Sequence, residues 1–153
     1  MTDFIKAGDT APEFTLKDQN GEQVSLSSFK GKKVLLSWHP LAWTSVCTDQ
    51  MRAREREYDK FEKANTVVLG ISVDPEPSKS AWAKFLCLKK LRILSDFSPL
   101  GKMSAAYGNF IDKLGFSGRA NVLIDENGKV IWAKVYDIPQ LPDIEEVLKQ
   151  VNA

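Results

Sequence analysis

Apolar and polar positions change their spacing several times along the chain, and each change predicts a different element. Residues 14–26 alternate apolar and polar side chains around Asn20-Gly21, a pattern typical of a β-hairpin. Residues 34–38 and 66–73 are short apolar runs and are predicted to be strands buried on both faces. Between them, apolar side chains recur at steps of three and four through residues 44–64, which predicts one amphipathic helix. Strand, helix and strand then form a crossover unit with parallel strands.

Shorter elements are predicted in the middle of the chain. Ser78 is expected to cap a second helix that runs to about Leu88. Trp82, Phe85 and Leu86 are expected to face the interior from this helix. A short strand and a short helix follow, at residues 92–94 and 100–107.

The end of the chain predicts a second hairpin and a last helix. Residues 120–124 and 130–135 flank the turn sequence Asp125-Glu126-Asn127-Gly128, and apolar side chains mark one face of a helix from Ile144 to Val151. Together these elements indicate an α/β protein with a central mixed β-sheet flanked by helices and preceded by an N-terminal β-hairpin. The thioredoxin-like fold is the commonest solution of this form. No repeat or linker divides the chain, so residues 1–153 are expected to form a single domain.

Composition and charge narrow the classes of function. The chain has 21 Lys and Arg against 20 Asp and Glu, a net charge of +1, which argues against nucleic acid as a partner. No apolar run approaches the roughly 20 residues of a membrane span, and residues 1–9 lack the regions of a secretory signal. Two cysteines are too few for a disulfide scaffold, so a cytoplasmic location is expected. One histidine and two distant cysteines do not build a metal site, and neither a metal nor a cofactor is expected.

The most informative segment is Pro40-Leu41-Ala42-Trp43-Thr44-Ser45-Val46-Cys47, which leaves a predicted strand and enters the long helix. Thr44 is the expected N-cap, so Cys47 lies in the first helical turn, where unpaired N–H groups and the helix dipole favour a thiolate. A nearby cation would favour it further, and Arg119 is the candidate. Each of these residues also has an ordinary structural explanation. Cys47 could be a small buried hydrophobic residue and Pro40 could only end the strand. Thr44 could only cap the helix, and Arg119 could form a surface ion pair.

Pro40, Thr44 and Cys47 stand in the register of the peroxiredoxin active-site signature. The resemblance extends over most of the chain, through residues 8–14, 94–97 and 107–108 to the segment of Arg119. The chain therefore resembles the peroxiredoxins of the alkyl hydroperoxide reductase C / thiol-specific antioxidant superfamily. Within it, the bacterioferritin-comigratory and alkyl hydroperoxide reductase E-like groups are the most similar.

This resemblance implies a thiol peroxidase. The Cys47 thiolate attacks a peroxide oxygen of hydrogen peroxide or an organic hydroperoxide and becomes a sulfenic acid. Thr44 and local amides hold the peroxide, Arg119 stabilises the thiolate and the leaving oxygen, and Pro40 shields the sulfur from water. Gln50 is expected to orient Arg119.

The role of Cys87, 40 residues beyond Cys47, stays open at this stage. Its position resembles that of a resolving cysteine that closes an intramolecular disulfide; the alternative is a one-cysteine enzyme in which Cys87 is not catalytic. Resolution by a cysteine in a C-terminal arm of a partner subunit is not expected, because residues 88–153 contain no cysteine. The resemblance implies thioredoxin or a similar dithiol protein as reductant, and a monomer or homodimer.

Two other functions compete with a peroxidase. A thioredoxin-like thiol–disulfide oxidoreductase normally has a second cysteine three residues after the first, where this chain has Gln50. A redox-sensing or chaperone-like module on the same fold is the non-enzymatic alternative. The sole histidine, His39, stands beside Pro40, where relatives usually carry an aromatic residue. His39 could act as a general base for the thiol, although a cysteine that is already a thiolate needs no base.

Overall fold

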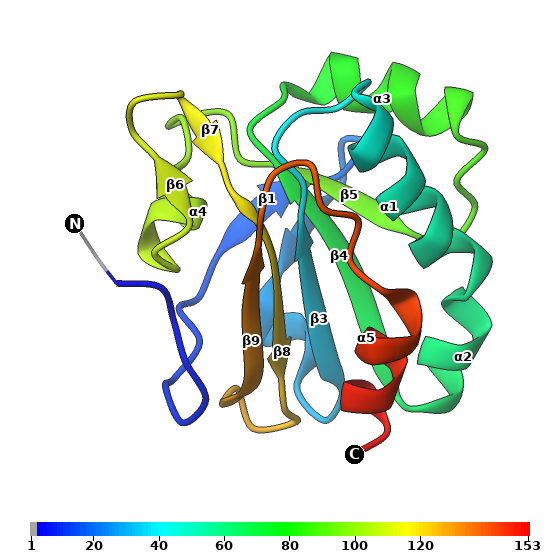
Figure 1. Ribbon diagram of the computed structural model, residues 1–153, viewed down its shortest axis with the longest axis vertical. Coiled ribbons are helices and arrows are strands. Elements are labelled where there is room, and N and C mark those ends of the chain that lie inside the picture. Colours follow the sequence, from blue (N-terminus) through cyan, green and yellow to red (C-terminus); the bar gives the residue numbers. More distant parts are fainter. Residues whose placement is uncertain (1–2) are drawn as a thin grey trace.

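A seven-stranded mixed sheet forms the centre of the molecule, in the order β2-β1-β5-β4-β3-β8-β9 (Figure 1). The computed structural model describes residues 3–153. The sheet strands are β1 (Thr15–Lys17), β2 (Gln23–Ser25), β3 (Lys33–Trp38), β4 (Thr66–Ser72), β5 (Arg92–Ser95), β8 (Arg119–Ile124) and β9 (Val130–Tyr136). The helices are α1 (Ser45–Arg56), α2 (Tyr58–Lys63), α3 (Glu76–Phe85), α4 (Lys102–Ala106) and α5 (Ile144–Val151), with a 3-10 turn at Leu26–Phe29. This mixed sheet flanked by helices confirms the predicted fold class.

The parallel centre of the sheet positions the segment that follows β3. Strand β3 pairs with β4 in parallel and with β8 in antiparallel orientation, and β4 pairs in parallel with β5. Both predicted hairpins are present, as β1 with β2 and β8 with β9. The chain passes from the end of β3 through a short loop into α1, at the carboxyl edge where α/β sheets usually carry their ligands.

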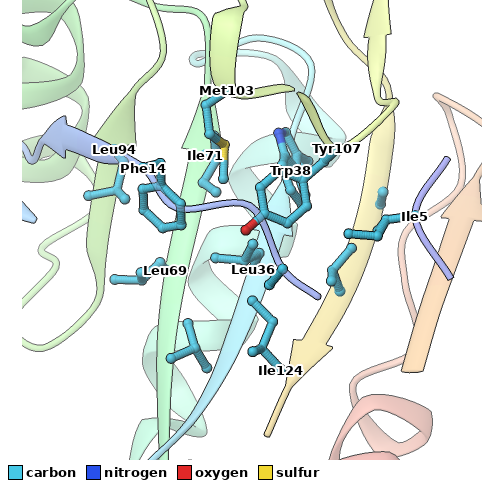
Figure 2. Close-up of a cluster of buried hydrophobic side chains, with 14 of the residues drawn as sticks. Ile5, Phe14, Leu36, Trp38, Leu69, Ile71, Leu94, Met103, Tyr107 and Ile124 are labelled. Atoms are coloured by element: carbon cyan, nitrogen blue, oxygen red, sulfur yellow. The ribbon is translucent and has the colours of Figure 1, made fainter. Parts of the chain in front are cut away.

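Two hydrophobic clusters cover the two faces of the sheet. On one face lie α1, α2, α3 and α5; the N-terminal segment and α4 lie on the other (Figure 1). Figure 2 shows the cluster on the α4 face, where Trp38 of β3 packs against Tyr107. The opposite cluster contains Cys47, Met51 and Trp82. Consecutive residues of β3 therefore alternate between the face covered by α4 and the face covered by α1 and α3.

The long helix predicted for residues 44–64 is wrong in one respect, because it is two helices. Glu57 leaves helical geometry with φ −99° and ψ 13°, although its amide still bonds to the carbonyl of Ala53. The break redirects α2, so that Tyr58 and Phe61 are buried against the sheet face. Sequence periodicity continues across this bend, which explains why the pattern alone did not show it.

The predicted start of the second helix is also wrong. Its N-cap is Pro75, and Ser78 lies inside α3. Prolines fit the first turn of a helix, where their missing N–H has no helical partner, so Pro75 and Pro77 set an earlier start. Trp82 and Leu86 are buried as expected, but Phe85 is 59% exposed. The short strands β6 (Phe110–Ile111) and β7 (Phe116–Ser117) form an additional small sheet that the sequence pattern did not predict.

Candidate active site

Cys47 lies in the first turn of α1 and is completely buried. Thr44 is the N-cap, as predicted, and its carbonyl accepts the first helical hydrogen bond, from the amide of Thr48. The free amides of this turn and the positive end of the helix dipole favour negative charge at the sulfur. The sulfur lies among apolar side chains, but a cation also reaches it.

That cation is Arg119, at the start of β8. Its Nη2 donates to the Cys47 Sγ at 3.4 Å, its Nη1 donates to the Gln50 side-chain oxygen, and its Nε donates to the carbonyl of Ile138 at 2.8 Å. The residue is only 2% exposed, and within residues 3–153 no carboxylate forms an ion pair with it. A buried guanidinium without a carboxylate has the sulfur as its nearest candidate for a counter-charge. The alternative of a surface-paired arginine is therefore wrong.

Gln50 connects this arginine to the central sheet. Its amide nitrogen donates to the Ser37 hydroxyl at 2.9 Å and to the Trp38 carbonyl at 3.1 Å, while its oxygen accepts from Arg119. The amide therefore has one orientation that satisfies all three bonds. Gln50 lies almost one turn after Cys47, so the same helix positions the thiol and fixes the guanidinium.

The loop before α1 is held by hydrogen bonds rather than by a side-chain cap. The Thr44 hydroxyl donates to the Leu41 carbonyl at 2.8 Å and makes no capping bond. The Ala42 amide donates to the Asp74 carboxylate at 2.8 Å. Trp43 adopts a left-handed conformation, φ 73°, and is half exposed. Pro40 is buried at the beginning of this loop.

Cys87 lies apart from this centre. It is exposed, follows the last residues of α3, and is not bonded to Cys47. Its φ of 56° is left-handed. The Cys87 amide bonds to the Lys84 carbonyl at 3.1 Å and the Leu88 amide to the Ala83 carbonyl at 3.0 Å, which is the Schellman arrangement that normally uses glycine.

The chain on either side of Cys87 is attached to α1. Phe85 stacks on Trp43 with ring centroids 5.5 Å apart and receives the Arg52 guanidinium at 5.8 Å. On the other side, the Glu55 carboxylate accepts bonds from three consecutive amides, those of residues 89–91, at 2.7, 3.0 and 3.1 Å. The end of α3 is therefore fixed to α1 at three levels: through Phe85 to Trp43 just before the helix and to Arg52 within it, and through residues 89–91 to Glu55 near its end.

A buried lysine and histidine were not singled out together from the sequence. Lys79 of α3 and His39, which follows β3, are both fully buried, and Lys79 Nζ lies 3.4 Å from His39 Nε2. Burial, with the charges of Lys79 and Arg119, holds the pKa of His39 well below its usual value, so the imidazole is neutral. The helical spacing of Lys79 to Trp82 and Leu86, three and seven residues, was the available signal that it faces inward.

Comparisons with known proteins show the family to which the chain belongs. Residues 7–133 match the AhpC/TSA family. Alkyl hydroperoxide reductase E of Mycobacterium tuberculosis is 36% identical over 133 residues, covering 86% of each chain. The chloroplastic peroxiredoxin Q of Sedum lineare is 40% identical over 152 residues, covering 97% of this chain and 79% of that protein.

Solved structures extend the similarity to three dimensions. The reduced 2-Cys peroxiredoxin of Plasmodium vivax matches with a TM-score of 0.89 at 32% identity, covering 97% of this chain and 81% of that one. Among residues 3–153, no helix has the length and apolar character needed to cross a bilayer. The same residues hold no group of three or more His, Cys, Asp or Glu side chains placed to bind a metal ion.

Proposed function

This chain belongs to the AhpC/TSA family and is a thiol peroxidase of the peroxiredoxin type, and we propose that Cys47 is the residue that attacks the hydroperoxide. The observation that carries the proposal is the bond from Arg119 Nη2 to the Cys47 Sγ. The guanidinium is buried, is held by Gln50 and the Ile138 carbonyl, and has no carboxylate partner among residues 3–153. A permanent cation in this position stabilises the nucleophilic thiolate.

The reaction requires only the groups of this site. The Cys47 thiolate bonds to one peroxide oxygen, the O–O bond breaks, and its electron pair leaves on the other oxygen. That oxygen takes up from solvent one proton, the equivalent of the one the thiol lost on ionising, and forms water or an alcohol. Sulfur is oxidised to a sulfenic acid and the peroxide is reduced. Arg119 stabilises the charge as it moves from sulfur to the leaving oxygen.

Thr44 and Pro40 are proposed to position the peroxide and shield the sulfur. Because the Thr44 hydroxyl already donates to the Leu41 carbonyl, its free lone pairs are available to accept a bond from the peroxide O–H. Pro40 has no N–H and is buried, so it contributes an apolar wall that competes for no hydrogen bond. Thr44 and Ser45 are exposed at the start of α1, and we propose that a peroxide approaches the buried sulfur from this end.

We propose that Cys87 then resolves the sulfenic acid. The Cys87 thiolate attacks the Cys47 sulfur, the S–O bond breaks, and an intramolecular disulfide forms. The oxygen leaves as hydroxide and takes up the equivalent of the proton that the Cys87 thiol lost, which gives water. A thioredoxin-like dithiol reductant restores both thiols by exchange. A disulfide needs Cα atoms within about 7 Å, so the end of α3 must leave its Schellman arrangement before the two sulfurs can meet.

Hydrogen peroxide and organic hydroperoxides are the proposed substrates, since the half-exposed Trp43 beside the loop permits a bulky group. We also infer one domain over residues 1–153 and a cytoplasmic location. The chloroplastic targeting in the name of one relative belongs to that protein.

Stopped-flow peroxide consumption, followed by intact mass under non-reducing conditions, tests the proposal. Cys47→Ser is expected to abolish consumption. Cys87→Ser is expected to keep the first oxidation and to accumulate a sulfenic or sulfinic Cys47, whereas the unmodified chain loses two hydrogens as a disulfide. Peroxidase turnover by Cys47→Ser would overturn the assignment of Cys47. A wild-type chain that stays a sulfenic acid with Cys87 free would overturn resolution by Cys87 and leave a one-cysteine enzyme.

A further inference from the structure

Arg54 is a second buried arginine, and the mechanism above gives it no part. It follows Cys47 and Gln50 in α1 at helical spacing, so the three side chains share the inner face of the helix. Arg54 has no exposed surface. Within residues 3–153 no carboxylate forms an ion pair with it, and its Nη1 has no hydrogen-bond partner.

Burial of this guanidinium has an energetic cost that the fold must offset. Burial lowers the pKa of Arg54 to about 10, so the side chain remains a cation at neutral pH. A buried cation without a paired anion is costly, because no nearby charge replaces the water that it loses. What Arg54 contributes must therefore come from the hydrogen bonds that it does make.

Arg54 bridges the two central strands that carry the active site. Its Nε donates to the hydroxyl oxygen of Ser37 in β3 at 3.2 Å, and its Nη2 donates to the side-chain oxygen of Asn121 in β8 at 3.4 Å. Ser37 and Asn121 are direct partners in the pairing of these strands. Asn121 lies two residues after Arg119, so both side chains project from the same face of β8. The two buried arginines therefore lie on one face of the sheet.

The Ser37 hydroxyl connects Arg54 to the active site. Gln50 Nε2 donates to the same oxygen at 2.9 Å, and the Gln50 oxygen accepts from Arg119 Nη1. A hydroxyl has one proton and two lone pairs. With one N–H from Arg54 and another from Gln50, both lone pairs are occupied and the hydroxyl proton points elsewhere. Without Arg54 that proton is free to turn toward Gln50, where it favours a flipped amide whose nitrogen opposes the Arg119 guanidinium.

The far side of Arg54 is fixed in the same way. Asn121 Nδ2 donates to the Tyr136 hydroxyl oxygen at 3.3 Å, and the Tyr136 hydroxyl donates to the Glu146 carboxylate at 3.1 Å. Glu146 also pairs with Lys134, at 2.9 Å. The carboxylate sets the direction of the hydroxyl proton, and the Asn121 oxygen is then the atom that faces the guanidinium. The network thus runs from an ion pair between β9 and α5 to the active-site sulfur.

We propose that Arg54 is a positioning residue for Arg119. It keeps the Ser37 oxygen an acceptor for Gln50. That bond in turn keeps the Gln50 oxygen toward the Arg119 guanidinium, whose Nη2 donates to the Cys47 sulfur. Within residues 3–153 Arg54 makes no hydrogen bond to Cys47, so its effect on the thiolate passes through its neighbours. This inference rests on the proposed role of Cys47.

A double-mutant cycle tests this inference, in a Cys87→Ser background so that only the first oxidation is measured. Arg54→Met removes the donors and keeps an unbranched side chain. We expect the second-order rate of Cys47 oxidation by hydrogen peroxide to fall about tenfold, a usual size of coupling between bonded neighbours. The midpoint of thiolate formation, followed by ultraviolet absorbance, should rise by roughly one pH unit, because Arg119 is less well aligned. In a Gln50→Met chain, which lacks the link, Arg54→Met should cause no further loss.

Ser37→Ala is the second variant, because it removes only the shared oxygen and leaves Arg54 in place. It should reproduce the loss of rate, and the two substitutions together should cost no more than either alone. Arg56→Met is the matched control, since Arg56 lies in the same helix with an exposed side chain. It should leave both the rate and the midpoint unchanged.

Two results would overturn the inference. One is an equal loss from Arg54→Met with and without Gln50, which would show that Arg54 acts through general stability. The other is an unchanged rate in both Arg54→Met and Ser37→Ala. Either result leaves the peroxidase intact, whereas a parent chain that peroxide does not oxidise at Cys47 would instead overturn the proposed function.

Discussion

The two cysteines lie at opposite kinds of helix end. Cys47 is buried in the first turn of α1, where the helix dipole is positive and Arg119 Nη2 donates to its sulfur. Cys87 is exposed just beyond the last turn of α3, where the unpaired groups are carbonyls. The positive end of a helix dipole stabilises an anion and the negative end destabilises one. The same side chain therefore meets opposite electrostatics, and we expect Cys47 to react with peroxide first.

The two sites also differ in what holds the backbone. Around Cys47, the helix, Gln50 and Arg119 form a closed set of hydrogen bonds. Around Cys87, the left-handed φ of 56° is unfavourable for a residue that has a Cβ. The segment is held in place by its bonds to Glu55 and by the contacts of Phe85. Glu55 follows Cys47 by eight residues, about 12 Å along a helix axis. One anchor of the Cys87 segment, Glu55, thus lies well along α1 from the sulfur, while the other, Phe85 on Trp43, lies beside the loop that precedes Cys47.

The largest expected effect comes from removing Arg119, the cation that contacts Cys47 and has no counterpart at Cys87. Arg119→Met should lower the second-order rate of Cys47 oxidation by roughly 10²- to 10³-fold at neutral pH, the usual cost of losing one stabilising donor. Stopped-flow oxidation with hydrogen peroxide measures it. Arg52→Met is the control, since Arg52 lies on the exposed side of α1 and contacts Phe85. Comparable losses in both variants would show that Arg119 acts through general stability.

A smaller effect should follow from loosening the second site. Glu55→Gln replaces a carboxylate that accepts three amide bonds by one neutral acceptor. Because hydrogen bonds to charged groups are stronger than neutral ones by about 1 kcal/mol, release of the α3 end should become roughly fivefold easier. Rapid quenching and mass analysis should show faster disulfide formation with an unchanged first oxidation. Glu57→Gln, a variant at the α1–α2 junction, should leave both steps unchanged; an unaltered disulfide rate in Glu55→Gln would show that this anchor does not limit closure.

Local patterns in the sequence were sufficient to predict much of the fold around the two cysteines. The hairpins, the buried parallel strands and the start of α1 at Thr44 follow from alternation, turn residues and capping, which depend on neighbours in sequence. Arg119, 72 residues from Cys47, was placed beside the thiol mainly through the family resemblance. Spacing along the chain cannot show which side chains meet across a sheet.

Other features depend on tertiary packing that the pattern does not encode. The break at Glu57 and the exposure of Phe85 depend on how α2 and α3 pack against the sheet and α1. Lysine is a surface residue by type, so the helical spacing of Lys79 to Trp82 was a weak signal, and its burial becomes clear only from the structure. The left-handed backbone conformation of Cys87 likewise cannot be predicted from composition.

The smallest effect tests the backbone at Cys87 itself. Cys87→Gly and Cys87→Ala both remove the thiol, but only glycine adopts φ 56° without a Cβ penalty. Glycine should therefore give the more stable protein, by about 1 kcal/mol in the free energy of unfolding in urea, despite its greater freedom when unfolded. An alanine variant as stable as the glycine variant would mean that the left-handed turn is not strained. If the difference is found, the wild-type chain holds a cysteine where glycine fits better, and the strain lowers the barrier to the local opening that resolution needs.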